Sequence, residues 1–367
     1  MRRCTTWTSQ LARASAVFLS TECLLRDKHR PSKSLPSKTT SCQQRPSCVA
    51  MTGDIFIDIV APVKKLPMWD SDVEAESVKM LPGGSALNQG RHLHALGTRV
   101  RFFGAVGNDT LGQSLVQQVA GQGFPTETIK MFSNLPSSVC MVLSGPSDRA
   151  FVSCYSTTDA FTTRDLQEQA DHLDGCTHFH LGGYFNMKGL QSRDFTEFVR
   201  SLKSRLSMTI SMNTQCDAAG HWCGEGNHLE EFLPSVDLLF VNISEGEHLC
   251  SALCHEGDRS IHALCKRFPN TTVVVTQGEH GCTVYRHGMH AIYVPTKPAV
   301  RIVDATGCGD AFIAGFLSSW LAQSAAPNTD AEHKALIEAC GRGHAVASVC
   351  LAREGACVEP VRPRDLE

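Results

Sequence analysis

The stretch Asp304-Ala305-Thr306-Gly307-Cys308-Gly309-Asp310 carries most of the information in this chain. It follows a run ending in Arg301-Ile302-Val303 that predicts a strand, and it precedes a longer apolar segment, 311–321. In that segment aromatic residues recur every four positions, at Phe312, Phe316 and Trp320. This period predicts a helix that is buried over a wide face. Two glycines and an aspartate therefore fall on the first turn of a buried helix.

A helix start of this composition is suited to binding an anion. The first backbone N–H groups of a helix have no partner within the helix and point outward. Gly307 and Gly309 would let a phosphate group come close to the backbone, because they carry no Cβ. The carboxylate of Asp310 can accept the proton of an attacking hydroxyl. The stretch therefore predicts phosphoryl transfer to a hydroxyl group.

Length and composition limit the classes of protein that fit. The chain has 367 residues, enough for one large or two medium domains, and 42% of them are hydrophobic. The formal net charge of −3 provides no basic surface for nucleic acid. No apolar run reaches the roughly 18–20 residues that cross a membrane. We therefore expect a cytoplasmic enzyme that acts on a small polar molecule and has no nucleic-acid or membrane partner.

Metal and disulfide patterns are missing from the sequence. The 17 cysteines include no Cys-x-x-Cys pair, and the 16 histidines include no His-Glu-x-x-His motif. An odd number of cysteines in a long chain indicates reduced, mostly buried thiols. His178 and His180 alternate along a predicted strand, which favours a place in the core. The phosphate-binding loop with a Gly-Lys-Ser/Thr ending is also lacking.

The first 45 residues differ from the rest of the chain. They are rich in Ser, Thr, Arg and Lys, and Glu22 and Asp27 are their only acids. This composition is typical of an organellar transit peptide, and a disordered extension is the alternative. The run 48–52 predicts a buried strand, so the folded unit should begin near Ser47. We expect one folded domain over 46–361 and a short tail over 362–367.

Strand-like and helix-like segments alternate from residue 47 onward. Continuous apolar runs separated by helices predict a parallel sheet covered on both faces. The runs lie at 100–106, 177–181, 208–212, 238–241 and 272–276, and helical segments lie at 85–96, 111–121 and 195–206.

Two segments do not fit this alternation. The first, 60–82, mixes charge, proline and alternating apolar residues. The second, 137–157, holds two short strand-like runs, 139–143 and 151–155, joined by a turn at Gly145-Pro146. Together they predict a small antiparallel sheet set apart from the main layer. Such a sheet could act as a lid over a cleft.

Polar and glycine residues follow several of the predicted strands. In open parallel sheets ligands bind beyond the carboxyl ends of the strands, so these residues are site candidates. They are Asp58, the pair Gly83-Gly84 that opens the helix of Asn88, Asn242 and Glu245, Gly278 and Gly281, and Asp310.

Four motifs in this order resemble those of the ribokinase-like carbohydrate kinases, the PfkB family, over most of residues 47–360. They are Gly83-Gly84-Ser85-Ala86-Leu87-Asn88 with Ala95-Leu96-Gly97, the Asn-x-x-Glu run Asn242-Ile243-Ser244-Glu245, the loop Thr276-Gln277-Gly278-Glu279-His280-Gly281, and 304–312. The resemblance implies a three-layer α/β/α fold with a mainly parallel central sheet and a small β lid. The chain departs from the family pattern at Ala305, where threonine is common, and at Cys308, where alanine is usual.

The resemblance also implies a role for each motif. Asp310 would be the catalytic base, and the N–H groups of Gly307, Cys308 and Gly309 would form the anion hole. The acceptor would bind to Asp58, Gly83, Gly84 and Asn88, and the nucleotide to Asn242, Thr276, Gly278 and Gly281. Glu245 would hold Mg²⁺ through water, and Asp304, with the backbone near Thr306, would hold a monovalent cation such as K⁺.

These roles predict an ATP-dependent kinase that phosphorylates a primary hydroxyl of a monosaccharide similar to ribose or fructose. A nucleoside kinase of the same fold is one alternative, although the chain has only four Tyr and four Trp for an aromatic pocket, so Phe would have to serve. A catalytically inactive member that acts as a binding partner is another. The lids of this family often mediate dimers, so the resemblance also implies a homodimer.

Overall fold

The computed structural model describes residues 47–145, 149–224, 226–254, 257–299, 301–323 and 330–367. The two predictions for residues 1–45, a transit peptide or a disordered extension, lie outside the described residues. Among the described helices, none combines the length and the apolar character needed to cross a membrane.

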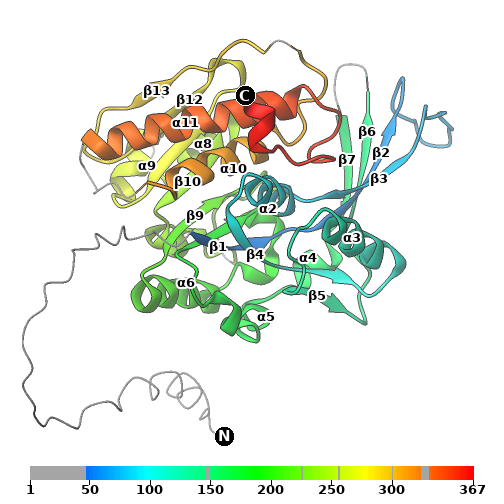
Figure 1. The fold of residues 1–367 in the computed structure, drawn as a ribbon, viewed down its shortest axis with the longest axis horizontal. Helices are drawn as coiled ribbons and strands as arrows, with labels where there is room; N and C mark the ends of the chain where they lie inside the picture. Colours follow the sequence, from blue (N-terminus) through cyan, green and yellow to red (C-terminus); the bar gives the residue numbers. More distant parts are fainter. Residues whose placement is uncertain (1–46, 146–148, 225, 255–256, 300, 324–329) are drawn as a thin grey trace, which may run out of the picture. The chain divides into compact units, whose positions relative to one another are not determined.

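A nine-stranded sheet forms the centre of the domain, in the order β13-β12-β11-β10-β9-β8-β1-β4-β5 (Figure 1). All neighbouring pairs from β11 to β5 are parallel, and β12 and β13 complete one edge in antiparallel pairing. The strands are β1 (Cys48–Gly53), β4 (Arg99–Gly107), β5 (Ile129–Phe132), β8 (His178–Gly182), β9 (Thr209–Asn213), β10 (Leu238–Asn242), β11 (Thr272–Thr276), β12 (Cys282–Tyr285) and β13 (Ile292–Val294). The predicted mainly parallel sheet is confirmed.

Helices cover both faces of this sheet, as continuous apolar strands require. One face packs against α6 (Arg193–Leu206), α7 (Leu229–Phe232), α8 (Ile243–Leu253) and α9 (Ile261–Arg267). The other packs against α2 (Ser85–Ala95), α3 (Thr110–Gly121), α10 (Cys308–Trp320) and α11 (Asp330–Leu351). Figure 1 shows α10 and α11 on one side of the sheet and α6 on the other. The remaining helices are short: α4 (Ser156–Ala160), α5 (Thr163–Gln167), and the 3-10 turns η1 (Ala170–Leu173), η2 (Tyr184–Asn186), η3 (Lys188–Leu190), η4 (Leu233–Ser235), η5 (Gly278–His280) and η6 (Pro363–Leu366).

Strand β1 lies in the middle of the sheet, between β8 and β4. Its side chains alternate between the two layers: Cys48 and Ala50 join the cluster of α6, and Val49 and Met51 join that of α10. The strand is buried throughout. The prediction that residues 48–52 form a buried strand is therefore confirmed, and so is the core position of His178 and His180 in β8.

Helix α10 is buried over most of its length, as its aromatic period predicts. Phe316 is fully buried and meets Phe240 of β10 edge to face, with ring centroids 5.1 Å apart. Burying one such side chain contributes about 1.5–3 kcal/mol. Gly315 lets α11 come close, because a Cβ there would lie 2.8 Å from the carbonyl oxygen of Arg342. This packing fixes the position of the amino end of α10.

A second, four-stranded sheet has the order β3-β2-β6-β7. Its strands are β2 (Phe56–Pro62), β3 (Lys79–Gly83), β6 (Val139–Ser144) and β7 (Arg149–Cys154). The predicted small lid sheet therefore forms. Its β2–β3 and β6–β7 pairs are antiparallel, as expected, whereas β2 and β6 pair in parallel in the middle of the sheet.

The strand predicted at 301–303 is wrong. This segment has no strand pairing, and Ile302 is 75% exposed. Its backbone is attached to a helix instead: the N–H groups of Val303 and Asp304 both donate to the carbonyl of Leu351, at the end of α11. A short run identifies a strand only when its backbone pairs with a sheet, and here the backbone donors pair with the end of α11 instead.

Candidate active site

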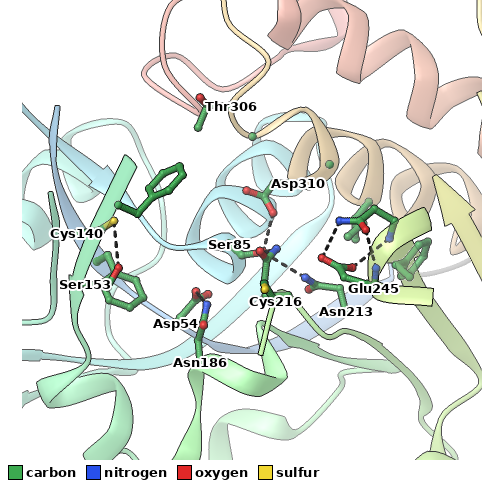
Figure 2. Close-up of a pocket in the computed structure, with 18 of the residues that line it drawn as sticks. Asp54, Ser85, Cys140, Ser153, Asn186, Asn213, Cys216, Glu245, Thr306 and Asp310 are labelled. Atoms are coloured by element: carbon green, nitrogen blue, oxygen red, sulfur yellow. Dashed lines mark hydrogen bonds between the residues drawn. The ribbon is translucent and has the colours of Figure 1, made fainter. Parts of the chain in front are cut away.

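A cavity of about 510 Å³ opens where the carboxyl ends of the parallel strands meet the lid (Figure 2). Loops after β1, β8 and β9, the end of β10, helix α2, the start of α10 and the lid strands all contribute to its wall. Its polar lining includes Asp54, Asp58, Ser85, Ser153, Asn186, Asn213, Gln215, Asn242, Glu245, Thr276, Thr306 and Asp310.

The amino end of α10 faces this cavity with unpaired backbone donors. Gly307 caps the helix with φ of 74°, a left-handed conformation that favours glycine. The N–H groups of Gly307 and Gly309 meet no acceptor among the described residues, while that of Cys308 reaches the carbonyl of Ala305 over a long 3.3 Å. Gly307 and Gly309 also line the cavity. The predicted anion hole therefore has two available donors, and the third is weakly engaged.

Asp310 lines the cavity, is 9% exposed, and is held by three side chains of α2. Its Oδ1 accepts from Ser85 Oγ at 2.7 Å and from Gln89 Nε2 at 3.0 Å, and its Oδ2 accepts from Asn88 Nδ2 at 3.3 Å. Burial raises the pKa of this carboxyl to about 7, against the lowering effect of these hydrogen bonds, and Asp54 raises it further. A carboxyl with a pKa near 7 is well placed to act as a general base at neutral pH.

A chain of buried hydrogen bonds leads from the sheet to this carboxylate. His178 and His180 flank Ser211 Oγ at 2.7 and 2.6 Å, and His180 Nε2 lies 2.6 Å from Gln89 Oε1. Burial lowers the pKa of His180 to about 3, so its ring is neutral. Since an amide oxygen can only accept, His180 Nε2 carries the proton and donates it. Gln89 in turn donates its amide N–H to Asp310, so the chain ends in a donor aimed at the carboxylate.

Asp54, which directly follows β1, and Asp58, which lies in lid strand β2, share the cavity with Asp310. Asp54 accepts from the backbone N–H of Ala86 and from Asn186 Nδ2, both at 2.8 Å, and its burial raises its pKa. Burial also raises the pKa of Asp58 to about 7, with further contributions from Asp54 and Asp310. Three carboxyl groups in one partly closed cavity form a polar surface suited to the hydroxyl groups of an acceptor.

The glycines of the first motif lie behind this surface. Gly83, Gly84 and Asn88 are not among the residues that line the cavity. A Cβ at Gly83 would lie 2.1 Å from a carboxylate oxygen of Asp58, and one at Gly84, where φ is 98°, would lie 2.4 Å from the carbonyl oxygen of Asp54. In the structure these glycines therefore leave room for Asp54 and Asp58. Their predicted contact with an acceptor stays a prediction.

The opposite wall of the cavity holds the Asn-x-x-Glu residues. Asn242 caps α8 and accepts from the N–H of Glu245 at 2.9 Å, while the Glu245 side chain accepts from Asn242 N and Nδ2. Burial raises the pKa of Glu245. Thr276, at the end of β11, lines the same wall, whereas Gly278 and Gly281 lie in the following turn and do not line the cavity. The predicted nucleotide residues are thus partly brought together.

The cavity has the oxygen ligands that suit a hydrated magnesium ion. Glu245 and Asn242 line it, and no group of three His, Cys, Asp or Glu able to hold a metal occurs among the described residues. Mg²⁺ keeps much of its water and is often held through few carboxylates plus substrate phosphates. The wall around Glu245 fits that mode of binding.

Asp304 lies outside the cavity wall and has protein partners. It accepts from the N–H and the hydroxyl of Thr306, and it pairs with Arg149 of lid strand β7 at 2.5 Å. Gly355 N donates to its other oxygen. These contacts hold the loop before α10 and join it to the lid, and the predicted monovalent cation stays a prediction.

Several site residues were missed by sequence reasoning. Asp54 directly follows β1, Asn186 lies in the loop after β8, and Asn213 ends β9. Their position at the carboxyl ends of strands was the signal that could have identified them. Gln89 lies inside the first motif, but only the packing of α2 against β8 shows that it bridges His180 and Asp310.

Comparisons with known proteins agree with this geometry. The family profile of the pfkB family carbohydrate kinases matches residues 47–362. Adenosine kinase of Saccharomyces cerevisiae is 25% identical over 276 residues, which cover 72% of this chain and 78% of that protein. A nucleoside kinase of Methanothermobacter thermautotrophicus is 25% identical over 307 residues, 83% of this chain and 89% of that protein.

Solved structures show the same fold. A ribokinase of Giardia lamblia superposes with a TM-score of 0.74, covering 87% of this chain and 98% of that one at 19% identity. This similarity confirms the ribokinase-like architecture with its large central sheet and small lid. Because the family profile covers nearly the whole described domain, the chain belongs to the pfkB family of carbohydrate kinases.

Proposed function

We propose that this protein is an ATP-dependent kinase that transfers the γ-phosphate of ATP to a primary hydroxyl of a monosaccharide. One observation carries the proposal: the Asp310 carboxylate and the unpaired N–H groups of Gly307 and Gly309 line one cavity on the same turn of α10. A base and an anion hole are the two groups that in-line phosphoryl transfer needs from the protein.

Each side of the cavity has a part in this reaction. Asp310 accepts the hydroxyl proton as the oxygen attacks, and the donors at Gly307 and Gly309 stabilise the charge on the transferring phosphoryl group. Asn242 and Thr276 face the nucleotide. Glu245 would hold Mg²⁺ through water, and the ion would neutralise phosphate charge when bound.

The acceptor lies on the lid side of Asp310. Asp54, Asp58 and Asn186 line this part of the cavity and offer oxygen and amide groups to sugar hydroxyls. Such hydrogen bonds orient one hydroxyl toward the base, and correct orientation is a large part of the rate enhancement of such enzymes. Lid strands β2 and β7 supply the surrounding apolar wall.

A nucleoside is the second candidate acceptor, and the lid gives a specific reason for it. Phe56, Phe151 and Tyr155 all line the cavity. Phe151 is also largely exposed, so its face is available to a ligand. Aromatic side chains stack on the flat face of a nucleobase. Two of the relatives in sequence carry the names adenosine kinase and nucleoside kinase.

A panel assay distinguishes the two acceptors. The full chain would be incubated with Mg-ATP and, separately, with ribose, fructose, adenosine and inosine, while ADP release is measured. Turnover with a free sugar supports the proposal, and turnover with nucleosides alone supports the second candidate. Binding of ATP without turnover on any acceptor would contradict both and would favour a binding protein.

Gln89 gives a test of how the base is positioned. We expect Gln89→Met to lower kcat about tenfold at neutral pH, because Asp310 loses one charge-assisted hydrogen bond. Since that bond lowers the pKa of Asp310, its loss should also move the rising limb of the pH–rate profile to higher pH. The kcat of both proteins would be measured from pH 6 to pH 9.

The pH profile separates positioning from general damage. If Gln89 acts through Asp310, part of the lost activity returns at high pH, where the carboxyl is ionised in both proteins. A loss of equal size at every pH would show that Gln89 is only structural. Gln113→Met is a matched control, because that glutamine bonds Asn108 on the exposed surface of α3.

A further inference from the structure

We propose that a second cavity binds the phosphate group of a small molecule. It measures about 220 Å³ and lies between the last turns of α2, the end of α3 and the segment near the C-terminus. The residues that line it are Arg91, His94, Ala95, Gln122, Phe124, Pro360 and Arg362. None of them lines the active-site cavity.

Arg91 is the reason to assign an anion to this cavity. It is only 1% exposed and is among the largest fully buried side chains of the described residues. Its Nη2 donates to Gln122 Oε1 at 2.5 Å and, over a long 3.5 Å, to the carbonyl of Val358. Its Nε and Nη1 have no acceptor among the described residues. Nor does any described carboxylate pair with it.

A buried guanidinium without a counter-ion is costly. Arginine stays protonated in proteins, so it cannot escape burial by losing its charge as a lysine can. Leaving such a charge unpaired in the interior costs several kcal/mol. Arg91 lines the cavity, so a phosphate there would place a negative charge beside this guanidinium, whose fork matches two phosphate oxygens.

The rest of the cavity wall fits the same ligand. The exposed side chain of Arg362 adds a second positive charge at the rim, and no acidic residue lines the cavity. Two acids are close to Arg362 in sequence: Glu359 is exposed and does not line the cavity, and Asp365 is already engaged by Arg353 at 3.0 Å and by the N–H of Arg362 at 2.8 Å. The charge of the wall is therefore uncompensated.

The shape of the cavity suits a phosphate attached to a small organic group. Phe124 and Pro360 give one side of the wall an apolar surface. A water molecule occupies about 30 Å³ of the liquid, so a cavity of about 220 Å³ exceeds the needs of one or two waters. The phosphate would lie against Arg91 and Arg362, and the carbon atoms would lie against Phe124.

Calorimetric titration of the full chain with inorganic phosphate tests the proposal. A saturating, non-hydrolysable ATP analogue with Mg²⁺ occupies the active site, and chloride keeps the ionic strength constant. We expect saturable binding of phosphate, and at least about tenfold weaker binding in Arg362→Gln, because one charge-assisted hydrogen bond is lost. Arg364→Gln is the matched control, because Arg364 is exposed nearby and does not line the cavity; it should bind as the wild type does.

Glycerol phosphate in a second titration identifies the source of the phosphate. Tighter binding of glycerol phosphate than of inorganic phosphate supports a small phosphorylated molecule, whereas the reverse order supports free phosphate as the ligand. The proposal is overturned if neither ion binds while the ATP analogue is present. It is also overturned if both bind equally well to Arg362→Gln, since the anion then lies elsewhere.

Thermal unfolding of Arg91→Met is an independent test of the proposal. In phosphate-free buffer its midpoint of thermal unfolding should equal or exceed that of the wild type, because an unpaired buried charge is replaced by an apolar chain of similar size. Added phosphate should raise the midpoint of the wild type and leave that of Arg91→Met unchanged. A variant that unfolds well below the wild type without phosphate would show that Arg91 is paired within the protein. If this variant does not fold, the Arg362→Gln titration decides.

Discussion

Replacement of Asp310 by asparagine should lower kcat by about 10²–10⁴-fold, the range that general-base catalysis contributes. The amide has the shape of the carboxylate, so Ser85 and Gln89 keep their positions beside it. It cannot accept the hydroxyl proton, however. The binding of a non-hydrolysable ATP analogue should stay within a few-fold of the wild type, because Asn242 and Thr276 on the opposite wall are untouched.

The same substitution should stabilise the fold, and more so at higher pH. Burial raises the pKa of Asp310 to about 7, while an unfolded aspartate titrates near 3.9. Between these values the folded wild type holds a proton that the unfolded chain has lost, so this group's contribution to stability falls as pH rises from about 4 to about 7. At 1.4 kcal/mol for each pKa unit, the gain of Asp310→Asn over the wild type reaches at most about 4 kcal/mol at pH 8.

Urea unfolding of both proteins at pH 5 and pH 8 measures this difference. Burial also lowers the pKa of His178 and His180, and this makes stability rise with pH, opposite to the effect of Asp310. The variant must therefore be compared with the wild type at each pH. The difference isolates Asp310. A variant that keeps more than a tenth of the wild-type kcat would contradict its role as the base, and a stability difference that shrinks at pH 8 would contradict the raised pKa.

The prediction of the fold succeeded where burial itself shapes the sequence. Helix α10 and strand β1 are buried on wide faces, so their apolar residues follow the helical or continuous pattern that identifies them. The glycines around Asp310 were informative for a similar reason, since a turn with φ of 74° at Gly307 favours glycine. Local geometry of this kind restricts which residues can occupy a position, so the sequence alone can reveal it.

The parts that were missed depend on contacts between distant elements. The bridge from His180 to Gln89 joins β8 to α2, 91 positions apart, and each residue alone is an ordinary buried polar side chain. Likewise, the pair Ile302-Val303 suggested a strand, but the N–H groups of Val303 and Asp304 donate to Leu351 at the end of α11. The unpaired charge of Arg91 could not be predicted from the sequence either. A buried arginine is unusual only when no carboxylate lies beside it, and the sequence alone does not show its neighbours.

Gly309→Ala should lower kcat/KM for ATP by about 10²–10³-fold, comparable to the loss of one donor from an oxyanion hole. A Cβ at Gly309 would meet nothing within 4 Å, and the residue lines the active-site cavity. The added methyl group therefore enters the space that a phosphate must occupy to reach the N–H donors. The fold itself should gain about 1 kcal/mol, since alanine is the better helix former.

Gly307→Ala is the informative counterpart, because it should fail for a different reason. Its Cβ would lie 2.6 Å from the Cβ of Ala356, and its backbone is left-handed, so the variant should unfold more easily than the wild type. Thermal unfolding and ATP kinetics of both variants separate the two causes. An inactive but stabilised Gly309→Ala places the loss at the phosphate, since no damage to the fold accompanies it. Wild-type kinetics in a folded Gly309→Ala would instead show that the phosphate does not approach this turn, and the anion hole at the start of α10 would have to be abandoned.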